Sequence, residues 1–404
     1  MGLYLDVYKL FKVQDQFFGF NRLSGEIIQF DSEHEANKWC SAHNQGYNMK
    51  LSDKYIDNFN NVVITVELNN ICNLDCVYCY QTKKNCRKEI SFSLIEKVVQ
   101  YIAEVHKQSA IHMLRLRFIG GEPLLSIEKL KFCYEKIKTF CISNEIELLT
   151  HIDTNGTIPF VNILQEVSNL DMTICLSTRE DHNFKRSDSF DKIMTNLQAT
   201  ADMQTCPITI RYNVAHDNYK KFDEFLCLVK QEMPQIKYIN TAWIMNNAGV
   251  EKFTNKLERK AFAVWNSTVA IDALLKHGFP VRHCIRSKLT KCQGYQKYSC
   301  KIYSDGAVTV CDAMQHEEAK LSLDELLKDI NLLTLRYANI KNYSPLEDLD
   351  CRKCSSVIQC GGKFFCRGAG NLCNYQSEYD EDSFIITYIK YYMQGNSTKF
   401  INMN

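Results

Sequence analysis

The stretch Cys72-Asn-Leu-Asp-Cys76-Val-Tyr-Cys79 places three cysteines on one short segment. It follows a strand-like apolar run at 62–68, so we expect the cysteines on the loop after a first β-strand. Thiolates this close together select zinc, copper(I) or an iron–sulfur cluster. Zinc usually takes four ligands in two pairs. Cys86, the next cysteine, is separated from the three by a polar stretch and is poorly placed to be the fourth ligand. A [4Fe–4S] cluster on three cysteines leaves one iron open to an outside ligand; the alternative is a zinc knuckle or reduced structural thiols.

The composition is that of a globular chain. Its 404 residues are 45% hydrophobic with a net charge of +1, which predicts two or three domains and gives no reason to expect nucleic acid or a membrane as partner. No apolar span or signal peptide is recognisable. Nineteen cysteines without an export signal indicate ligation rather than disulfides, and hence a cytoplasmic, anaerobic setting.

From 59 to 243 the sequence alternates short apolar strands with amphipathic helices. This alternation predicts a parallel sheet covered by helices, and a partial barrel with site residues at the carboxyl ends of its strands. We expect strands at 62–68, 114–119, 147–152, 172–176, 208–214 and 238–243, and helices at 93–107, 127–141, 161–168, 188–203 and 219–231.

Polar residues and glycines come at the ends of these strands. Gly120-Gly121-Glu122-Pro123 follows the second strand, where glycines admit a close ligand and Glu122 offers an acceptor for an ammonium group. Asn155 lies in a Thr-Asn-Gly-Thr turn after the third strand. Ser177 and then Arg186 follow the fourth strand, and Asn213 lies near the end of the fifth. The alternative for each residue is a role in a cap or turn.

Three further segments flank this region. In residues 1–58 the sequence predicts strands at 8–13 and 17–20, a turn at 21–25, a returning strand at 26–30 and a helix at 33–43. This arrangement is a β-hairpin plus helix. This segment either offers an open sheet edge or merely packs on the barrel. Residues 244–284 form a connecting region with one helix at 256–277, and 376–404 a C-terminal helix and tail.

The segment 285–375 is rich in cysteine. The run 303–308 predicts a hairpin with an Asp-Gly turn. Seven or eight thiol ligands in one small domain suit two iron–sulfur clusters better than zinc. The cysteines concerned are Cys292, Cys300, Cys311, Cys351, Cys354, Cys360, Cys366 and Cys373.

Residues 60 to 375 together resemble the radical SAM superfamily with a C-terminal SPASM domain. The cysteine loop is similar to its CxxxCxφC motif, with Tyr78 in the aromatic position, and the GGEP and TNGT sequences match motifs of the same family. The resemblance implies a [4Fe–4S] cluster on Cys72, Cys76 and Cys79 whose open iron binds S-adenosylmethionine (SAM). It implies contacts to SAM from Tyr78, Gly120, Gly121, Glu122, Asn155, Ser177, Arg186 and Asn213.

The same resemblance implies two auxiliary [4Fe–4S] clusters. One would use Cys292, Cys311, Cys366 and, as its weakest member, Cys300; without Cys300 it would keep an open iron. The other would use Cys351, Cys354, Cys360 and Cys373. The spacing Cys360-x5-Cys366 departs from the family's x3 by two residues at a Gly-Gly loop.

The resemblance implies an α/β fold: a partial (β/α)6 TIM-like barrel, a C-terminal cysteine-rich SPASM domain and a small N-terminal β-hairpin and helix segment. It implies an enzyme that reductively cleaves SAM to a 5′-deoxyadenosyl radical, using a flavodoxin or ferredoxin-type electron donor. The N-terminal segment resembles part of a precursor-peptide recognition module, which favours a maturase that crosslinks a ribosomally made peptide through thioether or C–C bonds. Asp312 matches the catalytic base of anaerobic sulfatase-maturing enzymes, which form formylglycine, the first alternative. The second alternative is a non-catalytic metal-binding adaptor.

Overall fold

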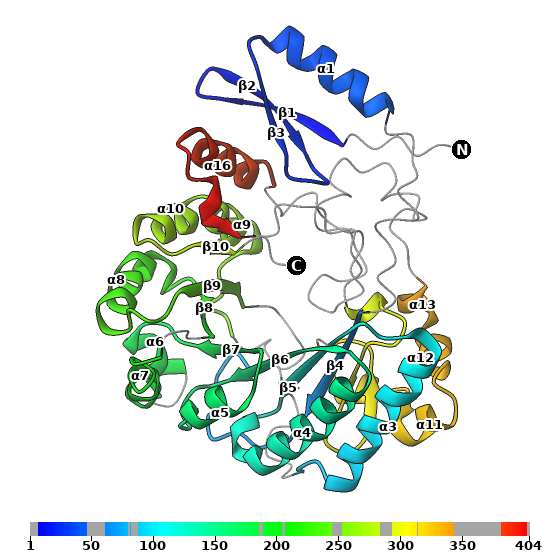
Figure 1. Cartoon of the computed structure of the whole chain (residues 1–404). Helices are drawn as coiled ribbons and strands as arrows, with labels where there is room; N and C mark the ends of the chain where they lie inside the picture. Colours follow the sequence, from blue (N-terminus) through cyan, green and yellow to red (C-terminus); the bar gives the residue numbers. More distant parts are fainter. Residues whose placement is uncertain are drawn as a thin grey trace.

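The computed structural model describes residues 7–46, 61–79, 81, 88–185, 189–203, 207–244, 253–282, 293–312, 314–342 and 381–401. The architecture consists of a small N-terminal sheet, a long curved sheet with helices along one side, and a C-terminal helix beside the N-terminal sheet (Figure 1).

The N-terminal unit is a three-stranded antiparallel sheet, β1 (Tyr8–Val13), β2 (Gln16–Asn21) and β3 (Ile27–Phe30), in that order. Helix α1 (Glu33–Gly46) packs against all three strands, so the three expected strands and the expected helix are present. Phe18 and Phe20 are fully buried and belong to the same apolar cluster as the main sheet. The Lys9 Nζ atom lies 2.5 Å from Asp382 Oδ1 in the C-terminal helix.

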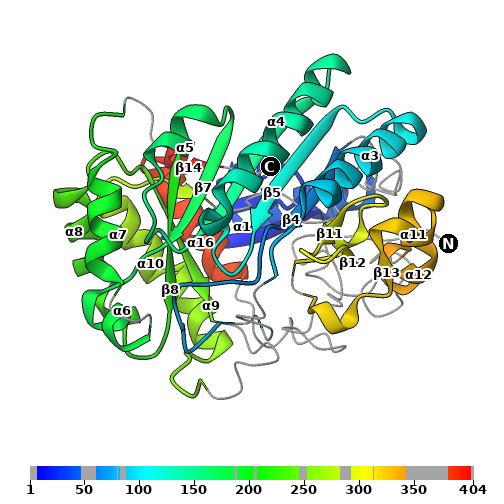
Figure 2. The same ribbon diagram turned by 90° about the horizontal axis from the view of Figure 1, so that it is seen from below.

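Six parallel strands form the centre of the main sheet, as the sequence predicts: β4 (Asn61–Glu67), β5 (Met113–Ile119), β6 (Glu147–Thr154), β7 (Leu170–Cys175), β8 (Ile208–Val214) and β9 (Tyr238–Trp243). Between them lie α3 (Phe92–Ser109), η1 (Pro123–Ser126), α4 (Ile127–Ser143), α5 (Val161–Glu166), α6 (Arg179–Lys185), α7 (Phe190–Gln198), η2 (Tyr219–Lys221) and α8 (Phe222–Glu232). The helices cover the outer side of the sheet (Figure 2).

Helix α3 shows how the sequence forms this layer. Ser91 caps its first turn by accepting a hydrogen bond from the backbone N–H of Leu94 at 3.1 Å. Ile95, Val98 and Ile102 recur at helical spacing and are buried against the sheet. The helix therefore begins at a capping serine and is held by one apolar face.

The cysteine-rich region extends this sheet beyond β4. Strand β11 (Cys300–Ile302) runs parallel to β4, and β12 (Ala307–Thr309) and β13 (Leu321–Ser322) follow antiparallel, so nine strands form one sheet (Figure 2). The predicted hairpin is present, with Gly306 at its turn in the left-handed region at φ +88°. Its attachment to β4 was not predicted.

The remaining elements complete the chain. The single helix expected at 256–277 is wrong: Thr268, at φ −126° and ψ −80°, separates α9 (Arg259–Ser267) from α10 (Val269–Lys276). The others are β10 (Val281–Arg282), η3 (Gln293–Tyr295), η4 (His316–Glu318), α11 (Leu323–Lys328), α12 (Leu332–Arg336), α13 (Ala338–Lys341), α16 (Glu381–Met393), η6 (Ser397–Lys399) and β14 (Phe400–Ile401), which pairs with β10.

Candidate functional site

The three-cysteine loop leaves the carboxyl end of β4. Cys72, Cys76 and Cys79 are half-buried and form no disulfide. Asn69, fully buried just before the loop, donates from Nδ2 to the carbonyl of Glu122 at 2.9 Å and to Ser126 Oγ at 2.7 Å. The start of the loop is thereby fixed to the segment that follows β5.

The two glycines after β5 allow this segment to lie directly on the loop. A Cβ atom on Gly121 would be 2.2 Å from the carbonyl oxygen of Ile71, and one on Gly120 would be 2.9 Å from that of Asn69. The backbone N–H groups of Gly121 and Glu122 donate to the same two carbonyls at 2.9 and 2.7 Å. The glycines therefore admit the cysteine loop itself. Their expected contact with SAM stays a prediction.

Glu122 is fully buried and holds two turns together. Its Oε1 accepts from the Leu124 N–H at 3.0 Å and from Thr154 Oγ1 at 2.6 Å, and its Oε2 accepts from the Asn155 N–H at 2.7 Å. This carboxylate joins the end of β5 to the end of β6. Its expected role toward the methionine amino group of SAM stays a prediction.

Asn155 turns its side chain toward the cysteine loop. Its Nδ2 lies 2.8 Å from Asn73 Oδ1 and 3.8 Å from the sulfur of Cys72. Gly156, at φ +75°, allows this turn, because a Cβ there would be strained and would lie 2.7 Å from Ile174. The turn after β6 is thus in contact with the first cysteine.

Tyr78 packs beside the residues that directly follow β8 and β9. Its ring is 6.0 Å from that of Phe253, edge to face, and it packs on the buried cluster of Ala215, Ile244 and Phe253. The cysteine loop therefore reaches from β4 to the ends of β8 and β9.

Ser177 belongs to a buried polar cluster. Its hydroxyl donates to Asp181, and its backbone N–H donates to Nε2 of His182 at 3.0 Å, which makes that ring nitrogen an acceptor. Asn218 Nδ2 donates to Asp181 at 3.2 Å and to the Asn213 carbonyl at 2.9 Å. Asp181 and Asn218 thus link Ser177 to the backbone of Asn213, and the contact of these two residues with SAM stays a prediction.

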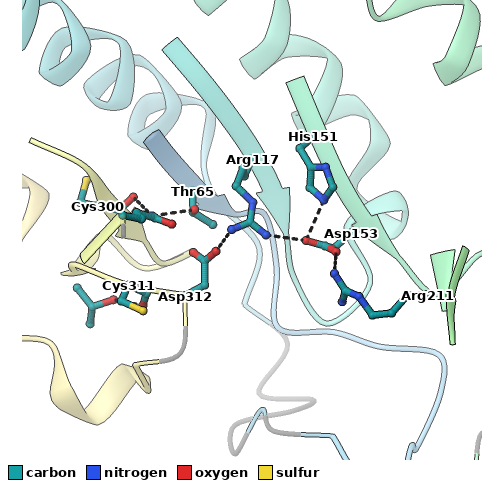
Figure 3. A network of polar contacts seen from close by, with 10 residues as sticks. Thr65, Arg117, His151, Asp153, Arg211, Cys300, Cys311 and Asp312 are labelled. Atoms are coloured by element: carbon teal, nitrogen blue, oxygen red, sulfur yellow. Dashed lines mark hydrogen bonds and ion pairs between the residues drawn. The ribbon is translucent and has the colours of Figure 1, made fainter. Parts of the chain in front are cut away.

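A charged network that the sequence analysis missed lines the inner face of the sheet (Figure 3). Arg117 on β5 pairs with Asp312 and lies 3.0 Å from Asp153 on β6. Asp153 also contacts Arg211 on β8 at 2.9 Å and His151 at 3.3 Å. This chain of ion pairs joins three strands, β5, β6 and β8, to the segment that follows β12.

The network sets the charge of its members. Burial would raise the pKa of Asp153, but the hydrogen bond from His151 and the charges of Arg211 and Arg117 outweigh it and hold the pKa well below its usual range. Burial would lower the pKa of His151, and its contacts with Asp153 and Asp171 raise it instead. Charged residues at alternate positions of a central strand, such as His151 and Asp153, point to the same face of the sheet. This alternation is the sequence signal that could have indicated the network.

The carboxylate of Asp312 lies beside Arg117 at the inner face of the sheet (Figure 3). One oxygen pairs with Arg117, and Oδ1 is buried without a hydrogen-bond partner among the described groups. Beside it, Lys301 on β11 lies 3.8 Å from Glu67 on β4, with both side chains nearly inaccessible. Burial lowers the pKa of Lys301 and raises that of Glu67. The predicted role of Asp312 as a base stays a prediction.

Of the auxiliary cysteines, the structure describes Cys300 and Cys311. Cys300 is fully buried on β11, and burial raises the pKa of its thiol to about 12. Its sulfur points away from Cys311 and Asp312 (Figure 3). The two thiols therefore do not converge here, and the ligand role of Cys300 stays a prediction. Arg186, Cys292, Cys351, Cys354, Cys360, Cys366 and Cys373 lie outside the described residues.

The donor set of the loop fits an iron–sulfur cluster in its chemistry. Within the described ranges no three His, Cys, Asp or Glu side chains are gathered closely enough to hold a metal ion. The three loop thiols nevertheless lie on one segment and form no disulfide among the described residues, and two N–H groups, from Leu74 at 3.4 Å and from Asn155, face the sulfur of Cys72. Backbone and amide donors toward a ligating sulfur are typical of iron–sulfur sites.

No helix in the described part of the chain is long and apolar enough to cross a membrane.

Comparison with known proteins identifies the central region. Residues 66–228 match the model of the Radical SAM superfamily. An uncharacterised protein of Methanocaldococcus jannaschii is 29% identical over 28% of this chain and 37% of its own length. GTP 3′,8-cyclase of Desulforamulus reducens is 22% identical over 51% of this chain and 66% of its own. The chain thus matches less than two thirds of the length of these relatives.

Two solved structures share the fold. The native structure of anSMEcpe with bound AdoMet superposes with a TM-score of 0.61 and 15% identity, covering 83% of this chain and all of that one. The structure of Streptococcus suis SuiB bound to precursor peptide SuiA gives a TM-score of 0.53 and 15% identity, covering 95% of this chain and all of that one. At this identity the likeness concerns the fold alone.

Proposed function

Because the chain carries a radical SAM domain and is an enzyme of that superfamily, we propose that it cleaves SAM reductively to a 5′-deoxyadenosyl radical and modifies a ribosomally made peptide by a thioether or C–C crosslink. Cys72, Cys76 and Cys79 would hold the [4Fe–4S] cluster, which supplies the electron when bound. The superfamily implies SAM and this cluster; two auxiliary clusters, a flavodoxin or ferredoxin-type donor and a cytoplasmic setting are parts of the proposal.

The N-terminal sheet is the observation that supports a peptide substrate. Strand β2 is central, β1 contacts α1 and α16, and no described strand pairs with the outer edge of β3. Such an edge presents unsatisfied N–H and C=O groups to another chain. The sheet is also joined to the catalytic body through the shared apolar cluster and the Lys9–Asp382 ion pair.

The register identifies the groups that a peptide would meet. The Asn21 N–H donates to the Glu26 carbonyl at 2.8 Å, so this pair is hydrogen-bonded across β2 and β3. In an antiparallel pair the direction alternates, so the N–H groups of Ile27 and Gln29 point to the free edge. SuiB, whose structure holds a precursor peptide, supports the proposal because its likeness extends over 95% of this chain.

A proline at Gln29 tests the edge directly. Gln29 is exposed, so Gln29→Pro removes one outward donor without breaking a bond to β2, whereas Gln29→Ala keeps it. The probes are labelled synthetic peptides encoded by short reading frames beside the gene, and the readout is fluorescence anisotropy. We expect Gln29→Pro to bind at least about tenfold more weakly, with SAM cleavage in the absence of peptide unchanged. Equal binding by the proline variant would show that this edge recruits nothing.

Asp312 favours a second candidate, the formation of formylglycine in a sulfatase. Its inward position and its unpartnered Oδ1 offer an acceptor for a substrate proton. Incubation with a sulfatase-derived cysteine peptide distinguishes the two functions. Conversion of that cysteine to the aldehyde, detected by mass spectrometry, would favour this second function over peptide crosslinking.

A further inference from the structure

The side chain of Asn155 is held in a closed ring of hydrogen bonds. Its Nδ2 donates to Asn73 Oδ1 at 2.8 Å, and Asn73 Nδ2 donates to Thr157 Oγ1 at 2.7 Å. Thr157 closes the ring by donating from Oγ1 to Asn155 Oδ1 at 2.6 Å. The ring joins the residue directly after Cys72 to the turn after β6.

The donors in this ring determine which end of the Asn155 amide faces Cys72. The backbone N–H of Thr157 can only donate, and it lies 2.9 Å from Asn155 Oδ1. The oxygen is therefore directed at Thr157, and the NH2 group is directed at Asn73 and at the Cys72 sulfur, 3.8 Å away. The Thr157 N–H thus identifies which atom of the Asn155 amide is the oxygen, and the other atom is the nitrogen.

We infer that Asn155 is a positioning residue that acts on the cluster through the sulfur of Cys72 and raises its reduction potential, rather than a residue that contacts SAM. The inference rests on the proposed function, since it needs a cluster on Cys72. Reduction adds negative charge to a cluster, and an N–H directed at a ligating sulfur stabilises that charge. The Leu74 N–H, 3.4 Å from the same sulfur, acts in the same direction.

The polar atoms of the Asn155 side chain and its backbone N–H already form hydrogen bonds within the protein, which leaves little capacity to bind the nucleoside or methionine group of SAM. Its oxygen accepts from two groups of Thr157, its amide nitrogen donates to Asn73 and Cys72, and its backbone N–H donates to Glu122. Binding SAM through this side chain would require the ring to open. The geometry therefore separates two expectations, a change in cluster potential and a change in SAM affinity.

Asn155→Leu removes the donor while retaining a similar volume, and Thr157→Val is the matched control. Thr157→Val removes the Thr157 hydroxyl and so opens the ring. It keeps the side-chain NH2 group of Asn155 and the backbone N–H of residue 157. Both variants would be reconstituted anaerobically, and the midpoint potential measured by titration of the electron paramagnetic resonance signal that responds to added SAM. The dissociation constant for SAM is measured on the same samples.

We expect Asn155→Leu to lower the equilibrium constant for reduction by up to about tenfold, which is about 59 mV for one electron. Thr157→Val should shift it much less, and both should bind SAM as the wild type does. An unchanged potential, with or without weaker SAM binding, would overturn the inference. Should Asn155→Leu take up no iron, Asn155→Asp replaces it, since the carboxylate keeps the shape and removes the donor. A wild-type protein without a SAM-responsive signal would refute the proposed function instead.

Discussion

Replacement of Gly121 by alanine tests whether the segment after β5 positions the cysteine loop. The new Cβ would lie 2.2 Å from the Ile71 carbonyl oxygen and 2.9 Å from the backbone nitrogen of Cys72. Both neighbours are backbone atoms, so no side-chain rotation relieves the contact. The Ile71 carbonyl must retreat by about 1.2 Å to reach ordinary contact at 3.4 Å.

The cost follows from what this displacement breaks. It removes the hydrogen bond from the Glu122 N–H to Ile71, at 2.7 Å, and strains that from Gly121 to Asn69, at 2.9 Å. Each is worth about 1 kcal/mol and the overpacking about 1–3 kcal/mol, so we expect a loss of about 2–5 kcal/mol in the free energy of unfolding. Because Cys72 moves with Ile71, iron uptake should fall as well.

Gly278→Ala is the control. Gly278 has φ +76° and its nearest outside atom is the flexible Lys230 Nζ at 3.9 Å, so alanine there incurs only backbone strain of about 1–2 kcal/mol. Urea unfolding gives the stability, and iron content after anaerobic reconstitution gives the cluster. If Gly121→Ala unfolds within about 0.5 kcal/mol of the wild type and takes up as much iron, the loop is not held as described.

Two further predictions concern the C-terminal region. The reconstituted protein should bind about twelve irons. Alanine at Cys351 and Cys354 should remove about four of them and leave SAM cleavage intact, whereas Cys76→Ala should abolish SAM cleavage. A wild-type content of about four irons plus zinc would contradict the SPASM assignment. Lys301→Met leaves Glu67 buried without its cationic partner and should cost about 3–5 kcal/mol, whereas changing both to Met should be nearly neutral. Burial raises the pKa of Glu67, so its contribution to stability is present below the usual glutamate pKa of about 4.3 and is lost as pH rises through the pKa of the folded state. The single variant should therefore lose stability more steeply as pH rises above about 4.3, and a flat urea-unfolding profile would argue against this pair.

The parallel sheet could be predicted because its determinants are local. Short apolar runs, amphipathic helices and the Ser91 cap depend on residues close in sequence, and the structure has all six strands. The hairpin at 303–308 is equally local, since its Asp-Gly turn fixes it. The break at Thr268 was missed because both halves continue the same apolar periodicity.

The sequence by itself determined the chemistry of the site: three cysteines on a loop after a strand, followed by glycines and polar turns at successive strand ends. Only the tertiary structure decided what those residues touch. Gly121 lies against the cysteine loop, Asn155 faces Cys72, and Arg117 joins Asp312 to Asp153 across elements far apart in the chain. Spacing along a chain specifies which side chains share a strand end, but contacts between strand ends depend on sheet order and register, which long-range packing sets.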